Sequence, residues 1–287
     1  MSFPKQAWII TAIALGAYFM LRSLPDTQCA FLHADHQPVV VDGLEFCGVN
    51  EEANFYSPKE LRFPVTLKIK RIGEGSAAEL LLIKEEGLPF YGHEVGVSHT
   101  KQVHLHLLQA GGERRYAHLH PMPSEDGTWH FDFPAQLYGD TPVRAYVDFA
   151  DARTGRVMLA ETIVENVPPI RHPQSPTSPR NQIVSTIASS TRAGTSAQLR
   201  LLLAGPGGAA LKLKPVMGSL GHAVIFSTEA GRTGYAHMHP TLEGGEYAET
   251  PTLTFRLRLP PAGQYDLWLH INDGQEELLR TTLVVTP

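Results

Sequence analysis

The sequence carries one histidine motif twice. Residues 116–121 read YAHLHP and residues 235–240 read YAHMHP, so a single conservative change separates the two copies. Imidazole nitrogens bind transition-metal ions, and histidines two apart on a strand point to the same side, where they can chelate one ion. The motif therefore predicts either a repeated metal site or a repeated structural corner in which the histidines bond backbone groups.

Alternation within the motif separates an apolar face from a histidine face. As a strand, the first copy places Ala117 and Leu119 on one side and His118 and His120 on the other. We expect the apolar side to face the core and the proline to end the strand. The second copy shows the same alternation at Ala236, His237, Met238 and His239.

Further histidines lie near each motif. In the second half, His222 opens the strand expected to pair with the motif, and His270 lies on a later strand. In the first half the third ligand is open among several histidines, and Asp148 stands where His270 stands in the second half. The predicted metal ligands are His99, His104, His106, His118, His120, His222, His237, His239 and His270.

The type of ligand favours copper, with zinc as the alternative. An imidazole-rich set with methionines nearby in sequence and no thiolate suits copper, and Cu(II) stands highest in the Irving–Williams order. The chain has no nucleophile elbow, phosphate loop or dinucleotide fingerprint, so we predict a protein that is not an enzyme. A zinc-dependent hydrolase built on the first-half histidines is the minor alternative.

Composition and pattern predict an all-β chain. The 25 glycines and 22 prolines suit short strands joined by turns, and a net charge of −5 predicts no nucleic-acid partner. Residues 76–87 align with residues 195–206, and each lies at the same distance before its motif. We predict two tandem β-sandwich domains, immunoglobulin-like or cupredoxin-like, at 61–167 and 182–287, joined by a proline-rich linker at 168–181.

The N-terminal segment is predicted to be a membrane anchor. Lys5 and Arg22 flank an uncharged run, which we interpret as an uncleaved signal-anchor helix over 1–24, with a cleaved signal as the alternative. The bulk of the chain would then lie on the periplasmic side, behind a stalk or cover segment at 25–60. In that compartment Cys29 and Cys47 could form a disulfide, and two free thiols are the alternative.

The second half resembles a group of bacterial secreted or membrane-anchored domains with a G-H…Y-x-H-x-HP…P-x-G-x-Y pattern. The matching positions are Gly221, His222, Tyr235, His237, His239, Pro240, Gly263 and Tyr265. The first half matches at Tyr116, His118, His120 and Pro121 but departs at the G-H position. The resemblance implies a cupredoxin-like or immunoglobulin-like sandwich associated with heavy-metal or copper handling.

Taken together, these features predict a membrane-anchored metal-binding protein for storage, delivery or sensing. The predicted partners are a metal ion, the membrane and a protein complex within it. The alternative function is a non-catalytic scaffold or accessory subunit whose histidines are structural. Geometry separates the two: ligand nitrogens must converge on one point, because bonds to such ions are ~2.0–2.1 Å long.

Overall fold

The computed structural model describes most of the chain. The described residues are 3–23, 39–41, 44–46, 65–73, 75–98, 100–109, 114–139, 141–155, 157–164, 179–229, 235–243 and 251–287. Cys29, Cys47 and His99 lie outside them, as do most of the predicted stalk and linker. The chain separates into two compact units, Met1–Ala34 and Asp35–Pro287.

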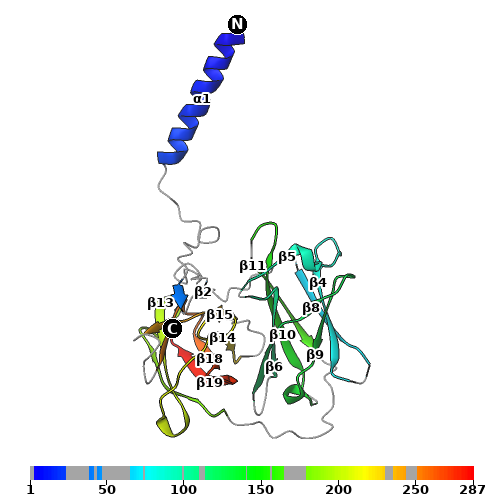
Figure 1. The fold of residues 1–287 in the computed structure, drawn as a ribbon, viewed down its shortest axis with the longest axis vertical. Helices are drawn as coiled ribbons and strands as arrows, with labels where there is room; N and C mark the ends of the chain where they lie inside the picture. Colours follow the sequence, from blue (N-terminus) through cyan, green and yellow to red (C-terminus); the bar gives the residue numbers. More distant parts are fainter. Residues whose placement is uncertain are drawn as a thin grey trace. The chain divides into compact units, whose positions relative to one another are not determined.

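The N-terminal unit contains helix α1 (Phe3–Ser23), drawn in blue in Figure 1. Within the described residues, no helix is long and apolar enough to cross a membrane. The predicted membrane anchor is therefore wrong, and the periplasmic location inferred from it loses its basis. The uncharged run from Gln6 to Leu21 is shorter than the ~20 apolar residues that a bilayer core requires, and it includes polar Gln6 and Thr11.

Antiparallel sheets dominate the rest of the described structure, which confirms the all-β prediction (Figure 1). In the first half, residues 65–164, one sheet has the order β3-β4-β9-β8 and the other the order β11-β10-β6-β7, with β5 paired to β10. Their bounds are β3 Val65–Arg71, β4 Ala77–Lys84, β5 Val95–Gly96, β6 Val103–Gln109, β7 Arg115–Leu119, β8 Met122–Pro123, β9 Thr128–Asp132, β10 Val143–Asp151 and β11 Val157–Val164.

The second half, residues 179–287, repeats this strand order. Its sheets run β12-β13-β17-β16 and β15-β14-β18-β19, so each strand has a counterpart in the first half. The bounds are β12 Gln182–Ala188, β13 Ser196–Ala204, β14 His222–Ser227, β15 Ala236–Met238, β16 Thr241–Glu243, β17 Thr252–Arg258, β18 Gly263–Asn272 and β19 Glu276–Val285. The remaining elements are β1 Val39–Val41, β2 Leu44–Phe46, η1 Gly92–Glu94, η2 Ala135–Leu137 and η3 Pro206–Gly208.

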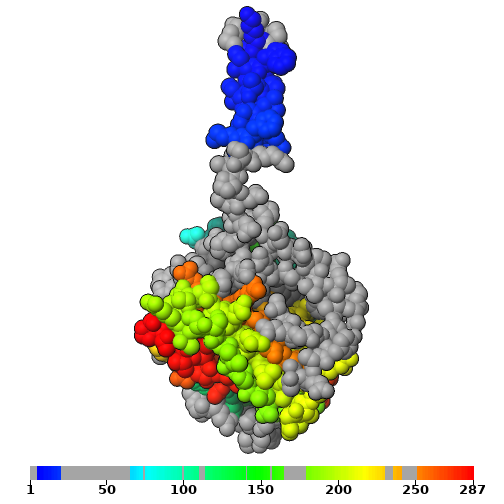
Figure 2. Space-filling model, turned by 90° about the vertical axis from the view of Figure 1, so that its left-hand side faces the viewer, coloured from blue at the N-terminus to red at the C-terminus, as the bar shows by residue number. Residues whose placement is uncertain are grey.

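Each half buries a hydrophobic core between its two sheets. Alternating residues of the strands supply these cores, because every second side chain of a strand points to the same face. Leu80 and Leu199, which align in the sequence, are both almost fully buried, one in each core. In the second half, strand β12 contacts strand β19, which is red in Figure 2. The hydroxyl groups of Thr186 and Thr281 form a hydrogen bond there, with their oxygens 3.3 Å apart.

A third apolar cluster contains residues of both halves. It consists of Leu108, Tyr116, Tyr146, Val224, Phe226, Tyr235 and Trp268. The two motif tyrosines make equivalent contacts in it: Tyr116 stacks on Trp268 with centroids 5.2 Å apart, and Tyr235 stacks on Tyr146 at 5.6 Å. The central strands β6 and β14 are buried along their whole length, with one face in the core of their own half and residues of the other face in this shared cluster.

Candidate metal centre

The histidine motifs form edge strands of these two sheets. Strand β7 pairs with β6 and places His118 opposite His106, while β15 pairs with β14 and places His237 opposite Val224. Ala117 and Ala236 lie in the cores of their own halves. The predicted separation of a core face from a histidine face is confirmed.

Each motif also marks the point where the chain leaves one sheet for the other. His120 and His239 follow the last residues of β7 and β15, and a proline follows each of them. The next strands, β8 and β16, belong to the opposite sheet of the same half. The second histidine of each motif is thus held at a sheet-to-sheet corner, beside the strand that carries the first.

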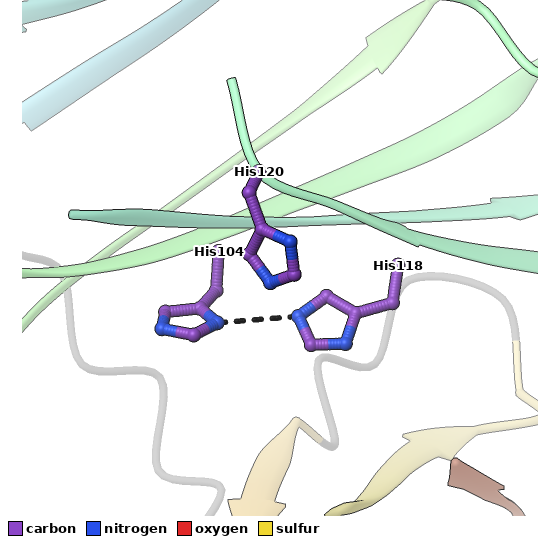
Figure 3. A group of neighbouring side chains, drawn as sticks. All are labelled: His104, His118 and His120. Carbon is purple, nitrogen blue, oxygen red and sulfur yellow. Dashed lines mark hydrogen bonds between the residues drawn. The ribbon is translucent and has the colours of Figure 1, made fainter. Parts of the chain in front are cut away.

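In the first half, His104 from β6 joins the motif histidines. Ring nitrogens of His104, His118 and His120, which we call the first triad, lie within 4.8 Å of one another. Figure 3 shows the three rings converging, and the dashed line joins His104 Nδ1 to His118 Nε2 at 3.2 Å. Two nitrogens bound to one ion at ~2.0–2.1 Å in a tetrahedral arrangement are about 3.3 Å apart, so the spacing fits shared coordination.

In the second half, His222 from β14 occupies the same place. Ring nitrogens of His222, His237 and His239, the second triad, also lie within 4.8 Å of one another. His222 Nδ1 is 3.1 Å from His237 Nε2 and 2.9 Å from His239 Nε2. The convergence that a metal site requires is present in both halves.

A backbone carbonyl fixes the tautomer of one histidine in each triad. His104 Nε2 lies 3.0 Å from Ser98 O, and His222 Nε2 lies 2.9 Å from Val216 O. Because a carbonyl only accepts, each Nε2 must carry the hydrogen, which leaves the Nδ1 lone pair facing the triad. Metal-binding histidines are typically oriented in this way by a partner behind the ring.

The turns that supply these carbonyls are equivalent. Ser98 and Lys101 pair across one turn, and Val216 and Ser219 pair across the other, with N–H···O distances of 2.7 and 3.1 Å in each. A Cβ placed on Gly218 would lie 3.9 Å from Cγ2 of Thr100, so the two turns lie against each other. This equivalence settles the choice left open by the sequence: His104 is the counterpart of His222.

One buried carboxylate lies beside the triads. Asp148 of β10 accepts a short hydrogen bond from the Tyr235 hydroxyl, and its Oδ2 lies 3.3 Å from His237 Nδ1 and 3.4 Å from His106 Nε2. Burial opposes its ionisation, but the adjacent His237 and His106 outweigh it and hold the Asp148 pKa well below its usual value. An ionised Asp148 can only accept, so His237 presents Nδ1–H to it, and in the neutral ring the Nε2 lone pair then faces the second triad.

The other predicted ligands lie around the triads rather than in them. His106 is buried, with Nδ1 2.7 Å from the Tyr116 hydroxyl and Nε2 facing Asp148. His270, opposite His222 in the strand register, lies 3.1 Å from Glu276, and its ring centroid is 5.9 Å from that of His118. His99 lies outside the described residues.

Burial keeps the first-half imidazoles neutral. Desolvation lowers the pKa of His104 and lowers that of His118 well below its usual value. It lowers the pKa of His106 to about 4 and that of His120 to about 3. Near neutral pH these rings therefore offer lone pairs rather than charges, which is the form that binds a metal ion.

Sequence reasoning missed the part played by Asp148 and the tyrosines. Asp148 aligns with His270, but nothing local to the sequence indicates that it reaches a histidine of the other half. Tyr116 and Tyr235 belong to the motif, and their hydroxyls bind His106 and Asp148 respectively. The available signal was an aspartate in an otherwise apolar strand segment, Val147 to Phe149.

The second half of the chain matches a family model. Residues 180–286 match the family described as a domain of unknown function (DUF8832), and no curated protein matches the chain. Among solved structures, a red sea bream transglutaminase is similar over 79% of this chain and 32% of its own, with 11% identity and a TM-score of 0.23. A tetra-tandem repeat from the extending region of a large adhesion protein is similar over 76% of this chain and 48% of its own, with 10% identity and a TM-score of 0.24. This chain thus spans about a third and about half of those two chains.

Proposed function

We propose that the chain is a metal-binding protein in which each histidine triad holds one ion. The observation that carries the proposal is the pair His222 Nδ1 and His237 Nε2, which lie 3.1 Å apart. Val216 O accepts from His222 Nε2–H and Asp148 accepts from His237 Nδ1–H, so in the neutral rings the lone pairs of His222 Nδ1 and His237 Nε2 face each other. A neutral His239 can donate Nε2–H to His222 Nδ1 at 2.9 Å. The facing pair itself cannot form a hydrogen bond, and a cation beside both atoms, a proton or a metal ion, makes it favourable.

The ligand set favours copper, with zinc as the alternative. Each triad offers imidazole nitrogens alone, and such sites follow the Irving–Williams order, in which Cu(II) stands highest. The two methionines closest in sequence to the motifs are placed differently, since Met238 lies in the core of the second half and Met122 is 68% exposed. Three ligands leave a position open on the ion, which suits storage, delivery or sensing, where the ion must enter and leave.

The halves fit the proposed pair of domains. Each has its own two sheets and its own core, in the same strand order. We infer two β-sandwich domains, corresponding to residues 61–167 and 182–287, each carrying one triad at the same sheet-to-sheet corner.

Titration of the full chain with Cu(II) and with Zn(II) tests the proposal. We expect two ions per chain, and one ion in each of the double variants His118→Ala/His120→Ala and His237→Ala/His239→Ala. His130→Ala is the matched control, because His130 is a strand histidine whose side chain is 47% exposed and which belongs to neither triad. It should keep both ions.

Circular dichroism and thermal unfolding of each variant show that loss of an ion is not loss of the fold. Equal stoichiometry in the parent chain and both double variants would contradict the proposal. The histidines would then be structural, with a proton in place of the metal ion.

A further inference from the structure

The two triads adjoin each other although they come from different halves. The ring centroids of His104 and His237 are 5.3 Å apart, and those of His118 and His237 are 5.8 Å apart. Those of His118 and His222 are separated by 6.4 Å. Contacts between the triads are therefore almost as close as contacts within them, where centroids lie 4.5 to 5.4 Å apart.

Asp148 lies between the triads. One ligand atom each of His104, Asp148 and His237 lie within 4.8 Å of one another, and all three residues are buried. The carboxylate thus belongs to the first half by sequence but stands behind a ligand of the second triad. A negative charge at this position offsets part of the repulsion between two nearby cations.

The strand register explains why the halves interlock here. Asp148 pairs with His104 across β6 and β10, and His270 pairs with His222 across β14 and β18. Each of these residues reaches the middle histidine of the opposite triad: Asp148 reaches His237 and His270 approaches His118. The same exchange in both directions indicates a pseudo-twofold relation between the triads.

We propose that the two triads form one paired metal centre, in which two ions bind close together and Asp148 of the first half holds the second ion's ligand in place. The inference rests on the proposed function. Because each ion lies ~2.0–2.1 Å from its nitrogen ligands, the ions on His104 and His237 lie within roughly 12 Å of each other. At such a separation two Cu(II) ions interact magnetically.

Electron paramagnetic resonance of the full chain loaded with Cu(II) tests the pairing. Each double variant, His118→Ala/His120→Ala or His237→Ala/His239→Ala, should give the spectrum of one isolated Cu(II) ion. The parent chain with two equivalents should give a spectrum broadened by dipolar coupling. A parent spectrum equal to the sum of the two single-triad spectra would overturn the pairing while leaving the proposed function intact.

Asp148→Asn tests the role of the carboxylate across the halves. It is placed in the His118→Ala/His120→Ala background, so that only the second triad binds Cu(II). Loss of a carboxylate behind a ligating histidine typically weakens metal binding ~10–100-fold, and we expect a loss in that range. Competition with a chelator of known affinity measures it.

Asp266→Asn in the same background is the matched control. Asp266 is also a buried aspartate with a partner in the other half, Arg114, but it does not belong to the metal-ligand groups. It should leave the affinity unchanged once thermal unfolding shows the variant to be folded. Unchanged affinity in Asp148→Asn, or an equal loss in both variants, would overturn the assignment of Asp148.

Discussion

The first and second triads are built on matching strands but differ in what lies behind the middle histidine. Behind His237 lies Asp148, which fixes the Nε2 lone pair toward the triad. The ring of His270 lies 5.9 Å from that of His118, centroid to centroid, and among the described residues His118 Nδ1 has no hydrogen-bond partner. The tautomer of His118 is therefore not fixed, and its Nε2–H can donate to His104 Nδ1 without any ion.

The two triads therefore depend on a bound cation to different degrees. The first triad can satisfy its hydrogen bonds with neutral imidazoles alone. In the second triad a neutral His239 can donate to His222 Nδ1, but His222 and His237 cannot donate to each other because their lone pairs face one another. We therefore expect the second triad to bind the first equivalent of metal and the first triad to bind the next.

The largest expected effect comes from removing the histidine that each carbonyl orients. His222→Ala should reduce metal affinity of the second triad by more than the ~100-fold that loss of a supporting partner costs, because a ligand itself is lost. His104→Ala should do the same to the first triad only. Affinities from chelator competition check this, and if either variant empties both triads equally, the two sites are not separately assembled.

Low pH should reduce the free energy of unfolding of the metal-free chain, because it protonates a buried histidine of the first half. The His106 pKa is lowered to about 4 by burial, so the unfolded chain takes up its proton before the folded chain does. The contribution of His106 to the free energy of unfolding is fully present above its pKa in the unfolded chain, about 6.5. It is lost as the pH falls toward and through its pKa in the folded chain, and the loss is about 3 kcal/mol. Denaturant unfolding at pH 7 and pH 4 measures it, with His106→Gln as the variant in which the decline should shrink.

Removing the hydroxyl of each motif tyrosine should have a smaller effect on stability, and the effect should differ between the halves. Tyr235→Phe removes a hydrogen bond to an ionised carboxylate and should cost about 1.5–3 kcal/mol of unfolding free energy. Tyr116→Phe removes a hydrogen bond to neutral His106 and should cost about 1 kcal/mol. Urea unfolding of the two metal-free variants compares them, and a larger cost for Tyr116→Phe would contradict the charge assigned to Asp148.

A gain rather than a loss of affinity is expected from giving the first triad a carboxylate like the one beside the second. His270→Asp places a carboxylate at the position that corresponds to Asp148, near His118. We expect the affinity of the first triad for Cu(II) to rise by about tenfold, the lower end of what such a partner contributes. Measuring it in the His237→Ala/His239→Ala background isolates the first triad, and no gain would show that the halves are not equivalent at this point.

The local sequence pattern predicted the strand faces and the repeated strand order of this protein. Alternation within YAHLHP and YAHMHP is enough to separate the core face from the histidine face, because the side-chain period of a strand is fixed at two. The repeat of the motif, with matching residues before it, similarly predicted the repeated strand order. The same approach failed at the N-terminus, where an apolar run was interpreted as a membrane span although no helix among the described residues is long and apolar enough for one.

Only the tertiary structure decided which groups meet the motif histidines. His99, His104 and His106 all precede the first motif by fewer than 20 residues, and the sequence does not choose among them. In the structure His104 joins the motif histidines, with its Nε2 held by the carbonyl of Ser98. Asp148 reaches His237 because two sheets pack face to face, and that contact joins residues 89 positions apart. A sequence pattern fixes which side of a strand a residue occupies, whereas the surface that covers that side depends on how whole sheets pack.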